Sequence, residues 1–152
     1  MEAVIFAGLQ AAGKSTFYRE HFFATHVRVN LDMLRTRRRE EMLLRCCLEM
    51  QQPFVVDNTN PTAADRARYI SAARAAGFRV VGYYFAAPVA DCIARNAARS
   101  PGERVPVAGI YGANKRFVPP TPAEGFDVLY VVRTGVAGVF TVEGWTDEPV
   151  AR

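Results

Sequence analysis

Short apolar runs alternate with longer stretches of helical character along most of this chain. The apolar runs have the length of strands and lie at residues 4–7, 27–30, 53–57, 78–85 and 126–133. The helix-compatible stretches lie at residues 16–23, 33–51, 61–76, 88–99 and 107–117. Such alternation is typical of α/β proteins, so we predict a three-layer, doubly wound domain with a mostly parallel sheet.

Turn and cap residues refine these boundaries. Asn60 is predicted to cap the helix that begins at Pro61, and Gly77 to end that helix. The segment 135–144 is expected to add a small edge strand.

A chain of 152 residues has the length of one domain. Within it we assign a helical lid to about residues 95–120 and a C-terminal tail to about residues 145–152.

Composition narrows the class of protein. No apolar run approaches ~18 residues and no signal segment opens the chain, which predicts a cytoplasmic protein. The three cysteines lack the spacing of a disulfide framework or a metal site. The net charge is +4, and arginines concentrate between Arg28 and Arg45, so a polyanionic partner is compatible with the sequence.

The first apolar run leads into a phosphate-binding motif. Gly8, Gly13, Lys14 and Ser15 match G-x-x-x-x-G-K-[ST], with a strand before the motif and a helix after it. In such a P-loop the backbone amides and the lysine bind phosphate, and the serine hydroxyl binds Mg²⁺. A turn that matches by chance is the weaker alternative. The predicted cofactors are ATP and Mg²⁺, and the loop residues expected to bind ATP are Gly8, Gln10, Ala11, Ala12, Gly13, Lys14, Ser15 and Thr16.

Two acids each follow a different predicted strand. Asp57 closes the run 53–57 and is expected to hold Mg²⁺ together with Ser15, directly or through water. Asp32 follows the run 27–30 and could accept a proton from an attacking hydroxyl, or simply cap a helix before Met33. Because parallel strands end at one edge of a sheet, we expect these acids to meet the P-loop there.

Two arginines are candidates for binding the triphosphate from a lid. Arg95 and Arg99 are four residues apart on the predicted helix 88–99, so they would share one face. The alternative is an ordinary solvated helix face. The segment Asn114 to Phe117 lacks the aspartate of the guanine-reading N-K-x-D element, which argues against a GTPase switch.

Within about residues 4–133 the chain carries, in order, the segments GLQAAGKSTF, VNLD, VVDNTNPTAADRARYISAARAAGF, RNAAR, VPVAGIYGANKRF and PPTPAEGFDVLYVV. In order and spacing, these segments resemble the kinase domain of the 5′-hydroxyl polynucleotide kinases of phage and animal DNA repair. The resemblance implies that Lys14 and Ser15 serve ATP and Mg²⁺, and that Asp32 is the general base. It also implies that Arg35 contacts the substrate phosphate and that Arg95 and Arg99 are the lid arginines.

Three functions remain open from the sequence. The first is an ATP-dependent kinase acting on the 5′-hydroxyl end of DNA or RNA, with Arg35 and Arg37 to Arg39 near the substrate backbone. The second is a P-loop kinase of a small hydroxylated metabolite, nucleotide or sugar nucleotide. The third is an ATP-binding module without phosphoryl transfer, which Asp32 and Arg35 disfavour because such a module needs no proton acceptor.

Overall fold

The computed structural model describes residues 1–147. Its six strands form one sheet in the order β2-β3-β1-β4-β5-β6. The strands are β1 (Glu2–Gly8), β2 (Val27–Val29), β3 (Phe54–Val56), β4 (Arg79–Phe85), β5 (Val128–Thr134) and β6 (Phe140–Gly144). The first five strands pair in parallel, and β6 pairs antiparallel with β5. The predicted α/β fold class with a mostly parallel sheet is therefore confirmed.

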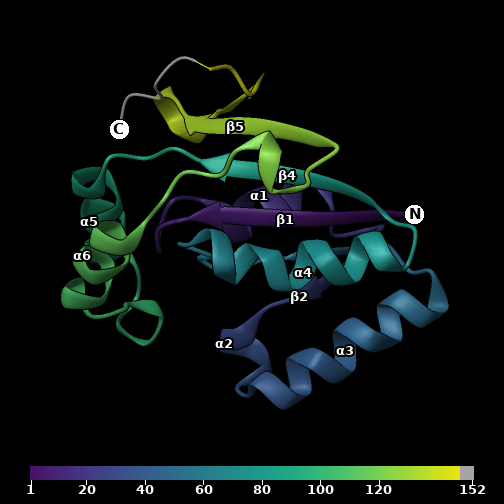
Figure 1. Ribbon diagram of the computed structural model, residues 1–152. Helices are drawn as coiled ribbons and strands as arrows, with labels where there is room; N and C mark the ends of the chain where they lie inside the picture. The colour runs from purple at the N-terminus through teal and green to yellow at the C-terminus, as the bar shows by residue number, and fades with distance from the viewer. Residues whose placement is uncertain (148–152) are drawn as a thin grey trace.

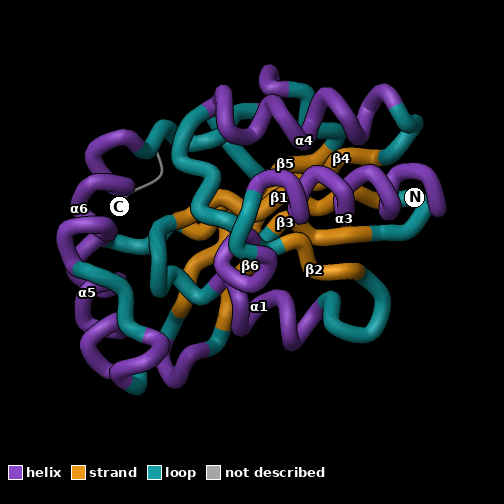
Figure 2. The backbone as a smooth tube through the Cα atoms, turned by 90° about the horizontal axis from the view of Figure 1, so that it is seen from below, coloured by secondary structure: helices purple, strands orange, loops and turns teal. Residues whose placement is uncertain are grey.

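Helices cover both faces of this sheet. They are α1 (Lys14–His21), α2 (Leu31–Leu34), α3 (Arg37–Met50), α4 (Ala63–Ala75), α5 (Val89–Ala98) and α6 (Val107–Arg116). Helices α3 and α4 lie on one side of the strands and α1 lies on the other (Figure 2). Helices α5 and α6 lie together at the end of the sheet opposite the N-terminus (Figure 1). The carboxyl ends of the parallel strands point toward this second helix pair.

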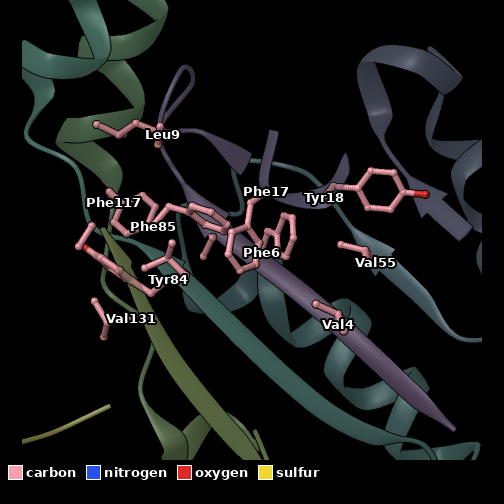
Figure 3. Packing of buried hydrophobic residues seen from close by; sticks show 14 of the residues in the cluster. Val4, Phe6, Leu9, Phe17, Tyr18, Val55, Tyr84, Phe85, Phe117 and Val131 are labelled. Atoms are coloured by element: carbon pink, nitrogen blue, oxygen red, sulfur yellow. The ribbon is translucent and has the colours of Figure 1, made fainter. Parts of the chain in front are cut away.

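Strand β1 supplies apolar side chains to both layers of the core. Val4 and Phe6 belong to the core cluster that includes Phe17 of α1, and Figure 3 shows Phe6 beside Phe17. Ala3 and Ile5 pack in the cluster of α3 and α4. All of these side chains are buried. Each large apolar side chain buried in this way contributes about 1.5–3 kcal/mol to stability. A strand that is apolar on both faces is what a central parallel strand requires.

The helix predicted at 33–51 is two helices. Helix α2 ends at Leu34, and its C-cap Arg35 has a φ of 76°, outside the helical range. Helix α3 then begins at Arg37, and the Thr36 side chain accepts a hydrogen bond from the Arg39 amide as its N-cap. The prediction of one helix was wrong. The residues on both sides of Thr36 favour helix, but the Thr36 side chain bonds to the backbone and starts a new helix there.

The start of α4 also differs from the prediction. Thr62, not Asn60, is the N-cap, because Thr62 and Asp65 form a reciprocal capping box. Asn60 has a φ of 45° and donates from its side chain to the Phe6 carbonyl at 2.8 Å. The predicted stop at Gly77, with a φ of 80°, is confirmed.

The remaining predictions fall at the C-terminal side. The expected edge strand is present as β6. Residues 148–152 of the expected C-terminal tail lie outside the described residues. Helix α6 and the Pro101–Glu103 turn lie within the segment assigned to a lid, and lid motion remains a prediction. Within residues 1–147, none of the helices has the length and hydrophobicity that crossing a membrane requires.

An ion pair of the buried Arg66 ties α4 to the segment that leads into β5. The fully buried Arg66 donates from Nε and Nη2 to the two carboxylate oxygens of Glu124, at 2.7 and 3.1 Å. Its Nη1 donates to the Asn60 carbonyl at 2.9 Å. Arg66 thus holds the loop after β3 against the segment that leads into β5.

Replacing Arg66 by alanine should lower the free energy of unfolding by about 3 kcal/mol, because Glu124 would lose its charged partner. Urea denaturation followed by circular dichroism measures this change. Arg68→Ala is the matched control, since Arg68 is an exposed arginine of the same helix and should change stability by less than about 0.5 kcal/mol. Equal losses in the two variants would contradict the structural role given to Arg66.

Candidate active site

Close packing fixes the phosphate-binding loop between β1 and α1. Gly13 precedes α1 with a φ of 100°, and a Cβ there would lie 3.0 Å from the Phe140 ring of β6. Gly8 pairs with Phe85 of β4, where a Cβ would lie 2.8 Å from the Phe85 Cβ. Larger residues at either position would require the loop or its neighbours to move.

Lys14 is folded back onto this loop. Its Nζ donates to the carbonyls of Gly8 and Leu9 at 2.9 and 2.7 Å. Burial lowers the pKa of Lys14 to about 8, although the nearby Asp57 carboxylate opposes this shift. The Asp32 carboxylate and the Arg99 guanidinium also act on the pKa of Lys14, so these side chains share one electrostatic environment.

Ser15 and Asp57 meet as their positions after β1 and β3 predict. The Ser15 hydroxyl donates to Asp57 Oδ2 at 3.0 Å, and Asp57 is only 2% exposed. A hydroxyl and a carboxylate are oxygen donors that suit Mg²⁺. Within residues 1–147 no group of three or more His, Cys, Asp or Glu side chains could hold a metal. A metal at Ser15 and Asp57 would therefore need further oxygens from its ligand or from water.

Arg28 completes this cluster and was not identified as a site residue from the sequence. Its Nε donates to Asp57 Oδ2 at 2.8 Å and its Nη2 to Ser15 Oγ at 2.9 Å. The available sequence signal was the alternation of apolar Val27 and Val29 with Arg28, and both valines pack in the layer of α3 and α4. Alternation along the strand then directs Arg28 to the other face, which α1 covers.

Asp32 lies in the first turn of the short helix α2, immediately after β2. The N-cap is Asn30, whose side chain accepts from the Met33 amide, so the helix-capping alternative for Asp32 is wrong. Asp32 is exposed and lines the cleft that contains Lys14 and Asp57. Within the described chain, its carboxylate makes no hydrogen bond to another side chain or to the backbone.

Three asparagines hold the loops together, and none was predicted as a site residue. Asn30 donates to the Asp57 carbonyl at 2.6 Å. The Asn58 side chain accepts from the Leu31 amide at 2.9 Å, which fixes the start of the helix that carries Asp32. Asn60 bonds to β1, as described above. Their positions in the loops that follow strands β2 and β3 were the available sequence signal.

A buried carboxylate supports the same region from α3. Glu40 is 1% exposed and accepts from Tyr69 at 2.8 Å, from Asn58 at 2.9 Å and from Arg37 Nη1 at 2.9 Å. Burial, followed by the hydrogen bond to Glu40, raises the pKa of Tyr69 to about 12. Tyr69 therefore remains a neutral hydrogen-bond donor at physiological pH.

These segments surround a cleft of about 640 Å³. Its basic lining residues are Lys14, Arg28, Arg37, Arg99 and Arg116, and its acidic lining residues are Asp32, Asp57 and Asp65. The predicted loop residues that line it are Gln10, Ala11, Gly13, Lys14, Ser15 and Thr16. Among the described side chains, Gln10 Oε1 is the buried polar atom without a hydrogen-bond partner, and this atom belongs to the loop itself.

The other predicted arginines occupy different places. Arg99 lines the cleft but is the C-cap of α5, one residue beyond the helix that was expected to carry it. Arg95 donates to the Ala11 carbonyl at 3.3 Å and so contacts the P-loop without lining the cleft. Arg35 is exposed and is not among the cleft-lining residues, whereas Arg37 is. The roles implied for Arg35 and Arg95 stay predictions.

Solved structures with similar folds are P-loop proteins of several kinds. A putative kinase from Chloroflexus aurantiacus has 19% identity and a TM-score of 0.64, with 89% of each chain covered. Kti12 from Chaetomium thermophilum, crystallised with ADP-AlF3, has 15% identity and a TM-score of 0.61, covering 90% of this chain and 92% of that chain. A gluconokinase from Sinorhizobium meliloti has 15% identity and a TM-score of 0.59, covering 87% and 82%.

These likenesses establish the fold, and the family follows from the sequence itself. The model of a family described as an AAA domain matches residues 4–120, which include the P-loop, Asp32, Asp57 and the arginines of α5. This match covers more than half of the chain. The chain therefore belongs to this AAA-domain family and has the fold of P-loop nucleotide-binding kinases.

Proposed function

We propose that this protein is an ATP-dependent kinase that transfers the γ-phosphoryl group to a 5′-hydroxyl end of DNA or RNA. The observation that carries the proposal is the exposed Asp32 carboxylate, which lines the same cleft as Lys14, Ser15 and Asp57. Asn30 takes the capping role, and Asn58 fixes the helix start. A carboxylate held in this way can accept a proton opposite a bound phosphate.

Each part of phosphoryl transfer has a candidate residue. The P-loop amides and Lys14 would hold the phosphates of ATP, and Arg99, with Arg95 at the loop, would offset charge on them. Ser15 and Asp57 would hold Mg²⁺, which neutralises charge on the phosphates when bound. Asp32 would take the proton of the attacking 5′-hydroxyl. The oxygen of that hydroxyl would bond to the γ-phosphorus as ADP leaves.

Two arginines among the residues that line the cleft suit an anionic substrate. Arg37 lines the cleft, and its Nη1 is anchored by Glu40 and Tyr69, at 2.9 and 3.0 Å. The remainder of the Arg37 side chain is available to a ligand, since it is 49% exposed. Arg116 of α6 also lines the cleft. A nucleic-acid end carries phosphates beside its 5′-hydroxyl, which these arginines suit.

A kinase of a small hydroxylated metabolite, nucleotide or sugar nucleotide is the second candidate. Its specific support is the structural likeness to a gluconokinase, although at 15% identity this likeness concerns the fold. Such an enzyme would use the same P-loop and Asp32 but would phosphorylate a free metabolite. The acceptor test below separates the two candidates.

Asp32→Asn should lower kcat for labelling a 5′-hydroxyl oligonucleotide roughly 10²–10⁴-fold, because asparagine cannot accept the proton. The measurement uses radiolabelled ATP and Mg²⁺, with ADP affinity determined in parallel and expected to be unchanged. Glu41→Gln is the control, since Glu41 is an exposed acid of α3 that does not line the cleft. Transfer by the wild type to metabolites but never to the oligonucleotide would favour the second candidate, and ATP binding without any acceptor would favour a non-catalytic module.

Arg37→Gln should raise KM for the oligonucleotide roughly tenfold while leaving ADP affinity unchanged. It should also reduce the slope of log KM against log salt by roughly 0.7, the value for one phosphate contact on a single strand. Arg38→Gln is the matched control, because Arg38 is the adjacent exposed arginine and does not line the cleft. Identical salt slopes for wild type and Arg37→Gln would argue against a phosphate contact at Arg37.

Binding of ADP should be coupled to the protonation of Lys14. The free protein has a Lys14 pKa of about 8, and phosphate oxygens nearby would raise it. Above pH 8, binding therefore takes up a proton and ADP affinity falls as pH rises. At pH 8.5 we expect uptake of roughly 0.8 proton for each ADP, and at pH 7.0 roughly 0.1.

Calorimetry in buffers of different ionisation enthalpy measures this uptake. Lys115→Met is the control and should not change it, because Lys115 is the chain's other lysine and is exposed on α6. Equal proton uptake at both pH values would contradict the assignment to Lys14.

A further inference from the structure

Arg28 places a positive charge on the two side chains that fit a metal ion. Its guanidinium reaches Asp57 Oδ2 at 2.8 Å through Nε and Ser15 Oγ at 2.9 Å through Nη2. These two oxygens are themselves joined at 3.0 Å by the Ser15 hydroxyl. One guanidinium therefore spans both oxygens.

Further contacts hold the Arg28 side chain in this position. The guanidinium lies over the ring of Tyr18, with its central carbon 5.9 Å from the ring centroid. Tyr18 is fixed in turn, because its hydroxyl donates to the His26 carbonyl at 2.7 Å. The Arg28 side chain remains 28% exposed, so solvent lies on one side of it.

The charge balance explains why an arginine is stable here. Asp57 is buried, and a buried carboxylate without a positive partner is costly. Within residues 1–147, Arg28 is the cation that forms an ion pair with Asp57. A divalent cation on the same oxygens would satisfy Asp57 equally well, but it would repel the guanidinium. We therefore expect the two cations to compete for Asp57 and Ser15.

We propose that Arg28 is an internal cation that competes with Mg²⁺ for Ser15 and Asp57 and thereby sets how strongly nucleotide binding depends on Mg²⁺. This inference rests on the Mg²⁺ part of the proposed function and not on the identity of the phosphoryl acceptor. In the metal-free protein Arg28 neutralises Asp57, and metal entry releases the arginine toward solvent. The arginine thus lowers the apparent affinity for Mg²⁺.

The test compares wild type with Arg28→Gln, using calorimetry of ADP binding in EDTA and in Mg²⁺. The quantity compared is the dissociation constant of ADP in EDTA divided by that in Mg²⁺. This ratio should be roughly tenfold larger in Arg28→Gln than in wild type, because Mg²⁺ no longer displaces a charged competitor. ADP affinity in EDTA should stay within about threefold of wild type. Arg28→Gln should also melt at a lower temperature in EDTA, and Mg²⁺ with ADP should restore more of its stability than in wild type.

Two further variants keep the test decisive. Arg79→Gln removes an exposed arginine of β4, 3.9 Å from Glu2 and outside the cleft, and should leave the ratio unchanged. Arg28→Lys keeps a charge without the two-pronged contact and should give an intermediate ratio, which also covers the case in which Arg28→Gln does not fold.

An unchanged ratio would overturn the proposal. A loss of ADP affinity in EDTA well beyond threefold would also overturn it, because Arg28 would then be a phosphate ligand. No acceptor is present in these measurements, so failure to label an oligonucleotide leaves the inference standing. A wild-type chain that binds neither ADP nor Mg²⁺ would overturn this inference and the proposed function together.

Discussion

The buried carboxylate of Asp57 is the interaction on which the rest of the cleft depends. Asp57 follows β3, and its backbone amide donates to the Val29 carbonyl at 2.8 Å. The Asn30 side chain donates to the Asp57 carbonyl at 2.6 Å. The Asp57 side chain receives the hydrogen bonds of Ser15 and Arg28. Backbone and side chain together therefore tie the ends of β2 and β3 to the P-loop. A negative charge at this depth is tolerated only because those partners surround it.

A second buried carboxylate, that of Glu40, also fixes loops that line the cleft. Glu40 joins α3 to α4 through Tyr69 and to the loop after β3 through Asn58. Asn58 is also bonded to the start of α2, so the position of Asp32 depends on a chain of hydrogen bonds that begins inside the protein. The site is consequently built on two layers of polar contacts that are buried beneath an open, charged cleft. Such networks favour a single arrangement of the loops.

Much of the fold could be predicted from the sequence because the central parallel strands β1 and β3 are apolar on both faces. The P-loop, Asp32 and Asp57 were locatable for the same reason, since each follows a recognisable strand. Contacts between distant segments were less accessible. The pairing of Arg28 with Asp57 depends on the order in which strands lie side by side, and Glu40 resembles any exposed helical acid until α4 covers it. Arg99 was displaced from its expected helix because the exact end of α5 depends on local turns.

The contact between Gly13 and Phe140 gives the C-terminal strand a mechanical role. Phe140 lies beyond the residues that the family match covers, yet its ring packs edge-on against Phe17 at 5.2 Å and beside the P-loop glycine. Strand β6 thus supports the phosphate-binding loop through the Phe140 ring. Shortening the chain before this strand would remove this packing contact. The phosphate-binding motif is therefore supported by a part of the chain that carries no motif of its own.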